Sequence, residues 1–253
     1  MNLKTIKNCY IFIEKPIDVS LKNYNKFQKF INKKKLKIFV GCNLRFNNAY
    51  NKLKKLIKSK KLGKINYSLI KSSMNIAKYH SYENYKKSYT SIKKLGGGIC
   101  FTNIHEIDLI LNLFDKTKLY NSLNAKLSNL KIDVDDYSVS IFKNQYNNNN
   151  FVTVLILDHF QINNERYVKI ICEKGEIIWD LVKTQILITK DRKAKKIKVT
   201  TNYNHMFLNE IKYFLNLVNK KKKIPIEYSE TNGFKCLKMA LEISKNNIKN
   251  LQI

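Results

Sequence analysis

The first 41 residues have the hydrophobic pattern of a strand–helix–strand unit. Short apolar runs at Tyr10–Ile13 and Leu36–Val40 predict two strands. Apolar residues at helical spacing between them predict a helix that ends near Lys33, with Asp18 or Ser20 as its N-cap. This order is the repeating unit of a parallel α/β sheet, and two strands do not form such a sheet alone. We therefore expect the trailing edge of a doubly wound domain.

Two further helices are predicted in the first half of the chain. A lysine-rich amphipathic pattern over 48–61 predicts a helix closed by a glycine C-cap at Gly63. A second apolar stripe, from Asn103 to Phe114, predicts a central helix with one buried face. Asn103 and Glu106 have the spacing of a capping box, which predicts where this helix begins.

The second half of the chain changes to strand periodicity. Short turns such as Lys174-Gly175 separate the apolar runs, and short turns join antiparallel strands. Two helices are predicted after them, around Phe207–Val218 and Phe234–Ile243, with Thr231 or Asn232 capping the second. The fold class is therefore α/β (α+β), with a short parallel segment followed by a domain with a large, mostly antiparallel open sheet. The predicted strands of this sheet are Ile65–Met74, Tyr137–Phe142, Phe151–Asp158, Tyr167–Glu173, Glu176–Leu181, Gln185–Thr189 and Lys196–Thr201.

The charge of the chain changes this picture little. The chain has 253 residues, of which 44% are hydrophobic, and a formal net charge of +29. A strong positive field attracts polyanions, but only three of the 48 basic residues are arginines, whose planar fork suits phosphates and base edges. Lysine, asparagine and isoleucine are abundant together, as AT-rich coding produces. We expect no specific nucleic-acid partner, because that function needs a basic stripe on one face.

Cysteine usage and hydropathy indicate a cytoplasmic protein. The five cysteines are widely spaced and include no CxxC pair, which favours reduced thiols over disulfides or a zinc site. We therefore predict no metal. The longest apolar run, Phe151 to Leu157, is far shorter than the roughly 18 residues that span a membrane.

His105 is the first candidate for chemistry. It falls in the first turn of its predicted helix, where free N–H groups carry partial positive charge. That field disfavours an imidazolium, so we expect a neutral histidine that can accept a proton. Asp108 continues the same face. A histidine that only hydrogen-bonds a loop would explain the spacing as well. Leu109 stands where an HExxH zinc protease needs its second histidine, so that class is excluded.

Lys15 is the second candidate. It lies between Glu14 and Pro16 at the carboxyl end of the first strand, and ligands of open α/β sheets bind at such ends. A lysine there can act as an acid or hold a substrate oxygen, although a solvated lysine is the simpler interpretation. Arg45, just beyond the second strand, is one of only three arginines. An aromatic-rich segment could line a sugar pocket or only cover the sheet; its members are Tyr79, His80, Tyr82, Tyr85 and Tyr89.

The triple glycine Gly96-Gly97-Gly98 is a poor phosphate-binding loop. Phe101 stands where a dinucleotide fingerprint needs its third glycine, and no strand leads directly into it. A close approach of the backbone to a neighbouring element explains the glycines better.

These motifs, in this order, resemble the Gfo/Idh/MocA oxidoreductases, the relatives of glucose–fructose oxidoreductase and inositol dehydrogenase. The resemblance spans essentially the whole chain and rests on the order of the motifs. They are Glu14-Lys15-Pro16, Val40-Gly41-Cys42-Asn43-Leu44-Arg45-Phe46, Lys61-Leu62-Gly63-Lys64-Ile65, Tyr85-Lys86-Lys87-Ser88-Tyr89, Leu95-Gly96-Gly97-Gly98, His105-Glu106-Ile107-Asp108 and Glu173-Lys174-Gly175-Glu176-Ile177-Ile178-Trp179-Asp180.

The resemblance implies a role for each motif. Lys15 and His105 would be catalytic, with His105 as the acid/base partner of the hydroxyl or carbonyl group that reacts. The cofactor, NAD or NADP, would be contacted by Glu14, Lys15, Pro16, Asn43 and Arg45. The substrate, a secondary alcohol or ketone of a sugar, cyclitol or nucleotide-linked sugar, would be contacted by Arg45, Tyr85, Thr102 and Asp108. Many members carry an aspartate where this chain has Thr102.

The resemblance also implies a division of the chain. Residues 1–41 would be the C-terminal remnant of a Rossmann NAD(P)-binding domain, and residues 42–253 the substrate and oligomerisation domain. The glycine-rich loop and the ribose-binding acid of the family have no counterpart here, so we expect an N-terminally truncated member. A homodimer or higher homo-oligomer would form through the C-terminal sheet. The alternative is a catalytically silent remnant that serves as a dimerising or sugar-binding module.

Overall fold

The N-terminal strand–helix–strand unit forms as predicted. The computed structural model describes residues 6–79, 83–199 and 202–248. β1 (Tyr10–Ile13) and β2 (Lys37–Val40) pair in parallel, and α1 (Tyr24–Lys34) connects them. The helix begins after Asn23, later than predicted, because the Asp18 carboxylate accepts the N–H groups of its own turn. Apolar residues of the unit form a small cluster of their own.

The large sheet confirms the prediction of a mostly antiparallel arrangement. Its order is β10-β9-β8-β7-β3-β6-β5-β4-β11, and only the β3–β6 and β4–β11 pairs are parallel. The strands are β3 (Ile65–Asn75), β4 (Lys116–Ala125), β5 (Tyr137–Tyr146), β6 (Asn149–Asp158), β7 (Phe160–Cys172), β8 (Gly175–Asp180), β9 (Gln185–Lys190), β10 (Lys193–Lys198) and β11 (Asn247–Ile248). The predicted strand at Lys196–Thr201 corresponds to β10 and ends outside the described residues.

The sequence pattern missed the short strand β11 and two longer parts of this sheet. β4 carries polar or exposed residues at most of its positions near the edge of the sheet, so it has no apolar alternation to detect. β7 begins at Phe160, well before the predicted Tyr167, because its first half is polar and largely solvated.

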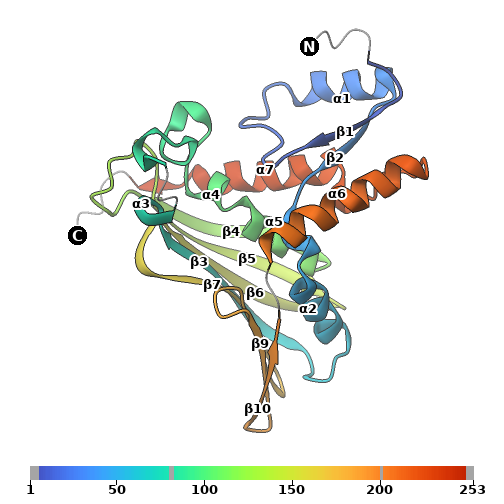
Figure 1. Cartoon of the computed structure of the whole chain (residues 1–253). Helices are drawn as coiled ribbons and strands as arrows, with labels where there is room; N and C mark the ends of the chain where they lie inside the picture. Colours follow the sequence, from blue (N-terminus) through green and yellow to red (C-terminus); the bar gives the residue numbers. More distant parts are fainter. Residues whose placement is uncertain (1–5, 80–82, 200–201, 249–253) are drawn as a thin grey trace.

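The helices cover one face of the sheet (Figure 1). They are α2 (Asn48–Lys58), α3 (Ile76–Tyr79), α4 (Ile99–Thr102), α5 (Ile104–Leu113), α6 (Tyr203–Asn219) and α7 (Glu230–Ser244). Single turns of 3-10 helix occur at Asn43–Phe46, Tyr85–Lys87, Tyr89–Ser91, Lys93–Leu95 and Ile226–Tyr228. α7 lies between the N-terminal unit and the large sheet, and contacts both. None of the described helices is long and apolar enough to cross a bilayer.

Two further predicted helix ends differ from the structure. α2 ends at Lys58, and Gly63 instead makes a left-handed turn (φ 81°) beside the Glu173 side chain. α7 begins after Ser229 rather than at Thr231 or Asn232. In each case a contact distant in sequence competes with the local capping pattern.

α5 is the buried centre of the molecule. Eight of its ten residues are buried, including the acidic pair Glu106 and Asp108. It packs on the core of the large sheet, where Phe142, Leu155 and Trp179 have no solvent exposure. The predicted capping box does not form, because the Asn103 side chain bonds to groups of the core instead. The buried carboxylates of this helix require partners, and these partners build the candidate site.

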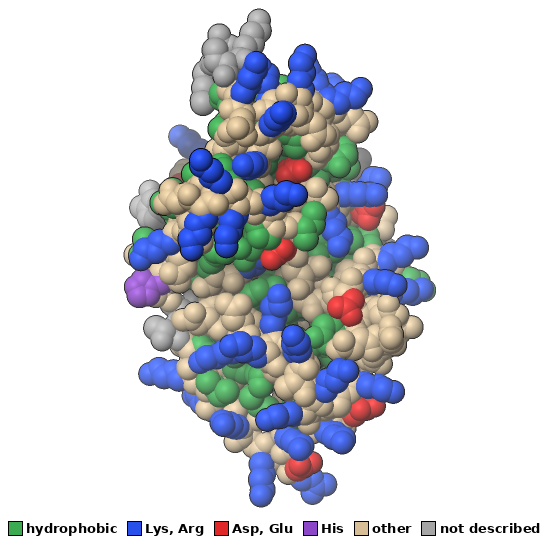
Figure 2. All heavy atoms as spheres, turned by 90° about the vertical axis from the view of Figure 1, so that its right-hand side faces the viewer, with side chains coloured by type: hydrophobic (Ala, Val, Ile, Leu, Met, Phe, Trp, Pro, Cys, Tyr) green, Lys and Arg blue, Asp and Glu red, His purple; other side chains and the backbone are tan. Residues whose placement is uncertain are grey.

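Basic side chains are distributed over the surface. Figure 2 shows Lys and Arg scattered across the whole visible face, with few acidic groups between them. The lysines of this face are not gathered into a single patch.

Candidate active site

Lys15 and His105 line the same cavity. It has a volume of about 430 Å³ and lies between the end of β1, the turn after β2, the start of α5 and the segment around Tyr85. Lys15 follows β1, and its Nζ lies 3.4 Å from the carbonyl oxygen of Thr102 at the end of α4. A groove of about 810 Å³ elsewhere on the surface contains neither residue. The smaller cavity is the better candidate, because cationic, imidazole and carboxylate groups converge on it.

Burial changes the protonation of both residues. Burial lowers the pKa of the Lys15 ammonium, against the opposite effect of Cys42 and Glu106. The pKa of His105 is held well below its usual value, first by burial and then by the positive charges of Lys15, Arg166 and Arg45. The sequence analysis attributed a neutral histidine to the helix start, whereas burial and these three cations are the causes found in the structure.

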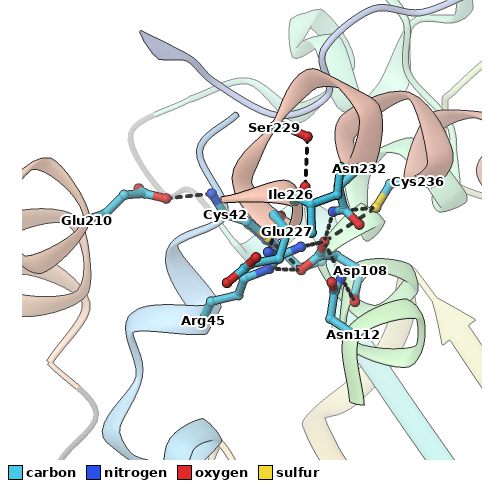
Figure 3. Close-up of polar contacts among 11 residues, drawn as sticks. Cys42, Arg45, Asp108, Asn112, Glu210, Ile226, Glu227, Ser229, Asn232 and Cys236 are labelled. Carbon is cyan, nitrogen blue, oxygen red and sulfur yellow. Dashed lines mark hydrogen bonds and ion pairs between the residues drawn. The ribbon is translucent and has the colours of Figure 1, made fainter. Parts of the chain in front are cut away.

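Arg45 and Asp108 hold each other in the protein interior (Figure 3). Arg45 is 4% exposed, and its guanidinium bonds both Asp108 oxygens, with Nε 2.7 Å from Oδ2. A third guanidinium contact goes to the carbonyl oxygen of Glu227, and the group lies 5.1 Å from the Tyr228 ring centroid. The Arg45 charge lowers the pKa of the Asp108 carboxyl despite its burial.

Asp108 also accepts hydrogen bonds from the turn after β2, from α7 and from its own helix. Cys42 Sγ lies 3.0 Å from its Oδ2, and Cys236 Sγ and Asn232 Nδ2 lie 3.4 and 3.1 Å from its Oδ1. Asn112, one turn further along α5, donates to the same oxygen over 3.0 Å. Arg45 and Asp108 therefore join the N-terminal unit, α5 and α7 to one another. Neither is among the described residues that line the 430 Å³ cavity.

The other predicted site residues are divided between two places. Glu14, Asn43, Tyr85 and Thr102 line the cavity with Lys15 and His105. Pro16 lies instead beside a small neighbouring void, together with Arg45 and Asp108. Among the aromatic-rich segment, Tyr89 also lines the cavity, whereas His80 and Tyr82 fall outside the described residues.

Arg166 is a cavity residue that the sequence analysis did not select. Its guanidinium donates to Glu106 Oε1 from Nε over 2.7 Å, and its Nη2 lies 2.6 Å from the same oxygen. Glu106 is 1% exposed and directly follows His105. Two of the three arginines in the chain therefore pair with the two acidic residues that follow His105 on α5. The scarcity of arginine was the available signal, and it was applied only to Arg45.

The triple glycine allows two segments of backbone to pack closely together. A Cβ on Gly97 would lie 2.3 Å from the carbonyl oxygen of Tyr89 and 2.8 Å from that of Thr90. The N–H groups of Gly96, Gly97 and Gly98 all donate to backbone carbonyl oxygens of the preceding turns. They are therefore not free to hold a phosphate, in agreement with the close backbone approach inferred from the sequence.

Comparisons with solved structures identify the fold. No protein-family model matches the sequence, and the comparison with curated proteins found no match. A levoglucosan dehydrogenase in complex with NADH and levoglucosan is 16% identical, with a TM-score of 0.77 over 94% of this chain and 71% of its own. The myo-inositol 2-dehydrogenase of Lactobacillus plantarum is 20% identical (TM-score 0.71; 94% and 70%). The UDP-N-acetylglucosamine 3-dehydrogenase of Acidithiobacillus ferrooxidans is 15% identical (TM-score 0.70; 93% and 70%).

The chain has the fold of the Gfo/Idh/MocA-type oxidoreductases. At these identities the similarity shows the fold alone. The choice of candidate site residues therefore depends on the geometry of this structure.

The 430 Å³ cavity has room for one ring of a dinucleotide such as a nicotinamide cofactor. Its volume and its mixture of apolar and polar groups suit a small-molecule ring beside Lys15. The pyrophosphate requires a cradle of free N–H groups at a helix start, and the described residues contain no glycine-rich turn that provides one. They also contain no group of three His, Cys, Asp or Glu that could hold a metal ion.

Proposed function

We propose that the chain carries the acid–base part of an NAD(P)-dependent oxidoreductase. Its reaction would interconvert a secondary alcohol and a ketone on a sugar, cyclitol or nucleotide-linked sugar. The observation that supports this proposal most strongly is the convergence of Lys15 and His105 on one cavity. The dehydrogenases of similar fold act on sugars or a cyclitol, which supports the substrate class.

The proposed mechanism divides proton and hydride between chain and cofactor. The nicotinamide, when bound, supplies the hydride chemistry. In alcohol oxidation the Lys15 ammonium donates a hydrogen bond to the substrate oxygen and favours the negative charge that develops there. Neutral His105 accepts the hydroxyl proton, so that the oxygen is left as a ketone. In the reverse direction His105 returns this proton. Tyr85 and Thr102 lie in the same cavity and would orient the substrate.

We further propose that the phosphate end of the cofactor is held by a polypeptide segment other than those described. Within the described residues β1 pairs only with β2, so one of its edges remains available to another strand. We expect the chain alone to bind NADH weakly, and to bind it more tightly when co-expressed with the segment encoded immediately upstream. Fluorescence titration with NADH measures both. Micromolar binding by the chain alone would contradict this proposal.

The catalytic proposal has its own test. The protein reconstituted with its cofactor-binding partner is assayed for oxidation of sugars, cyclitols and nucleotide sugars. We expect His105→Gln to lower kcat about 100-fold or more, because it removes the proton acceptor. His205→Gln changes an exposed histidine on α6 and is the matched control. An active protein that tolerates His105→Gln would refute the role of His105.

The second candidate is a silent, dimerising module, and the face of the sheet opposite the helices supports the dimerisation that it requires. Alternate residues there are apolar and partly exposed, among them Tyr67, Val152, Val154 and Ile156. We propose that a second copy of the chain covers this face. The silent module predicts dimers without any oxidation activity, whereas the enzyme predicts both.

We propose a cytoplasmic location, supported by the redox state of the thiols. All five cysteines are free, and four of them are buried. A reducing compartment is the usual place for such a set.

A further inference from the structure

Cys42 connects the proposed proton acceptor to the buried ion pair. It is buried at the turn after β2, with its Sγ 3.5 Å from His105 Nδ1 and 3.0 Å from Asp108 Oδ2. Its backbone N–H donates to Glu210 Oε1 of α6 over 2.5 Å, which fixes the position of this residue (Figure 3). The Cys42 sulfur therefore contacts His105 and Asp108, and the Cys42 backbone is fixed by Glu210.

The protonation states of Asp108 and Cys42 determine which group donates in each hydrogen bond of the series His105, Cys42, Asp108. Asp108 is gripped by Arg45 at both oxygens and is ionised, so it can only accept. Burial and the Asp108 charge raise the pKa of the Cys42 thiol well above its usual value, so the thiol keeps its proton. A thiol has one proton, and the nearer carboxylate oxygen receives it. The sulfur therefore faces His105 with a lone pair.

A sulfur lone pair requires an N–H opposite to it. A neutral imidazole carries its single proton on Nδ1 or on Nε2. With the proton on Nε2, two lone pairs would face each other across 3.5 Å, at the cost of the hydrogen bond. With the proton on Nδ1, His105 donates to Cys42, Cys42 donates to Asp108, and every group is satisfied.

The opposite ring nitrogen is then left free for chemistry. Cys42 is the only described residue recorded in a hydrogen bond with the His105 ring. The ring also lines the 430 Å³ cavity, whereas Cys42 does not. Because Nδ1 is directed at Cys42, Nε2 is the nitrogen available to a molecule in the cavity, and without a proton it is an acceptor.

We propose that Cys42 is a positioning residue that holds His105 in the Nδ1–H tautomer and so makes Nε2 the proton acceptor. This inference rests on the proposed function for its purpose, but the tautomer itself exists without substrate or cofactor. It gives a physical task to a thiol that cannot act as a nucleophile while it remains buried and protonated.

The experiment is ¹⁵N NMR of the histidine side chains in the full chain. Long-range ¹H–¹⁵N correlations at neutral pH distinguish a protonated from an unprotonated ring nitrogen, and His105→Gln assigns the signals of His105. We expect the wild-type protein to show His105 with Nδ1 protonated. We expect Cys42→Ser to preserve this pattern, because a hydroxyl can also donate to Asp108 and accept from Nδ1.

Cys42→Val removes both functions while keeping an apolar volume of similar size. We expect its ratio of Nδ1–H to Nε2–H to fall about three- to tenfold, the effect of losing one ordinary hydrogen bond. Cys236→Val is the matched control, because Cys236 bonds to the other oxygen of the same carboxylate, while the described hydrogen bond of the His105 ring goes to Cys42. We expect it to leave the tautomer ratio unchanged.

Each outcome has a definite meaning. A wild-type protein with His105 protonated on Nε2 overturns the inference, even if Cys42→Val does not fold. So does a folded Cys42→Val protein that keeps the wild-type ratio. If the tautomer is as proposed but His105→Gln retains full dehydrogenase activity, the proposed function fails and the inference about Cys42 stands.

Discussion

The Lys15 ammonium donates a hydrogen bond to the carbonyl oxygen of Thr102, with Nζ 3.4 Å from this oxygen. The two residues are 87 positions apart in the sequence. Thr102 stands three residues before His105, so this bond brings the end of β1 to the start of α5. A cation and a neutral imidazole then share one cavity, and the charge on one controls the protonation of the other.

The first prediction concerns this electrostatic coupling. In Lys15→Met we expect the pKa of His105 to rise, because the largest charged contribution that lowers it is removed. Burial and the two arginines remain, so the pKa should still lie below its usual value. NMR titration of His105 measures the change. Lys55→Met on the exposed side of α2 is the control, and an equal rise there would show that the coupling is not specific.

The second prediction concerns the buried ion pair. We expect Arg45→Lys to lower the free energy of unfolding by about 3 kcal/mol or more, because an ammonium cannot bond both Asp108 oxygens and the Glu227 carbonyl. Chemical denaturation measures this difference. Arg192→Lys, in an exposed turn before β10, should change stability by less than about 0.5 kcal/mol. Equal effects at the two positions would contradict the structural role of Arg45.

The third prediction concerns pH. Burial raises the pKa of Glu210 to about 7, above its ordinary value of 4.5. Between these values the folded chain binds a proton that the unfolded chain releases, so this group lowers stability as pH rises through the window. Glu210→Gln removes the effect and can still accept the N–H of Cys42. We expect its stability relative to wild type to improve between pH 5 and pH 8, by up to about 3 kcal/mol. Denaturation curves at several pH values test this, and an improvement toward acid pH would contradict it.

The fourth prediction concerns assembly. We expect Val152→Asp to shift the protein from dimer to monomer, because a carboxylate on the uncovered face of β6 would be desolvated in the interface. Light scattering after gel filtration measures the mass. Leu95→Asp is the control, since Leu95 is also exposed but lies in the turn before the triple glycine. A wild-type monomer at high concentration would contradict the proposed interface.

Periodicity predicted the elements whose two faces differ. The alternation in β6 and the stripe in α5 were visible in the sequence because one side of each is buried. β4 and the start of β7 carried no such contrast and were missed. Helix caps were predicted poorly, because Asp18 accepts the N–H groups of its own turn and Asn103 bonds to Ser72, which is distant in sequence.

Only the part of the site that lies at the ends of predicted strands and helices could be predicted from the sequence. Placing Lys15 after a strand and His105 at the start of a helix was enough to expect a shared cavity. The partners of Glu106 and Asp108 could not be predicted, because Arg166 and Arg45 lie about 60 positions away along the chain. Spacing rules describe one element at a time and contain no information on such pairs.

Those two guanidinium groups also limit how many arginines of this chain can be replaced by lysine. A bias toward lysine codons can replace solvent-facing arginines at little energetic cost, and Arg192 stands at such an exposed position. At position 45 a single ammonium could not bond both Asp108 oxygens and the Glu227 carbonyl oxygen, and at position 166 it would lose one of the two nitrogens that contact Glu106 Oε1. We therefore expect selection for a stable fold to oppose the replacement of these two arginines by lysine.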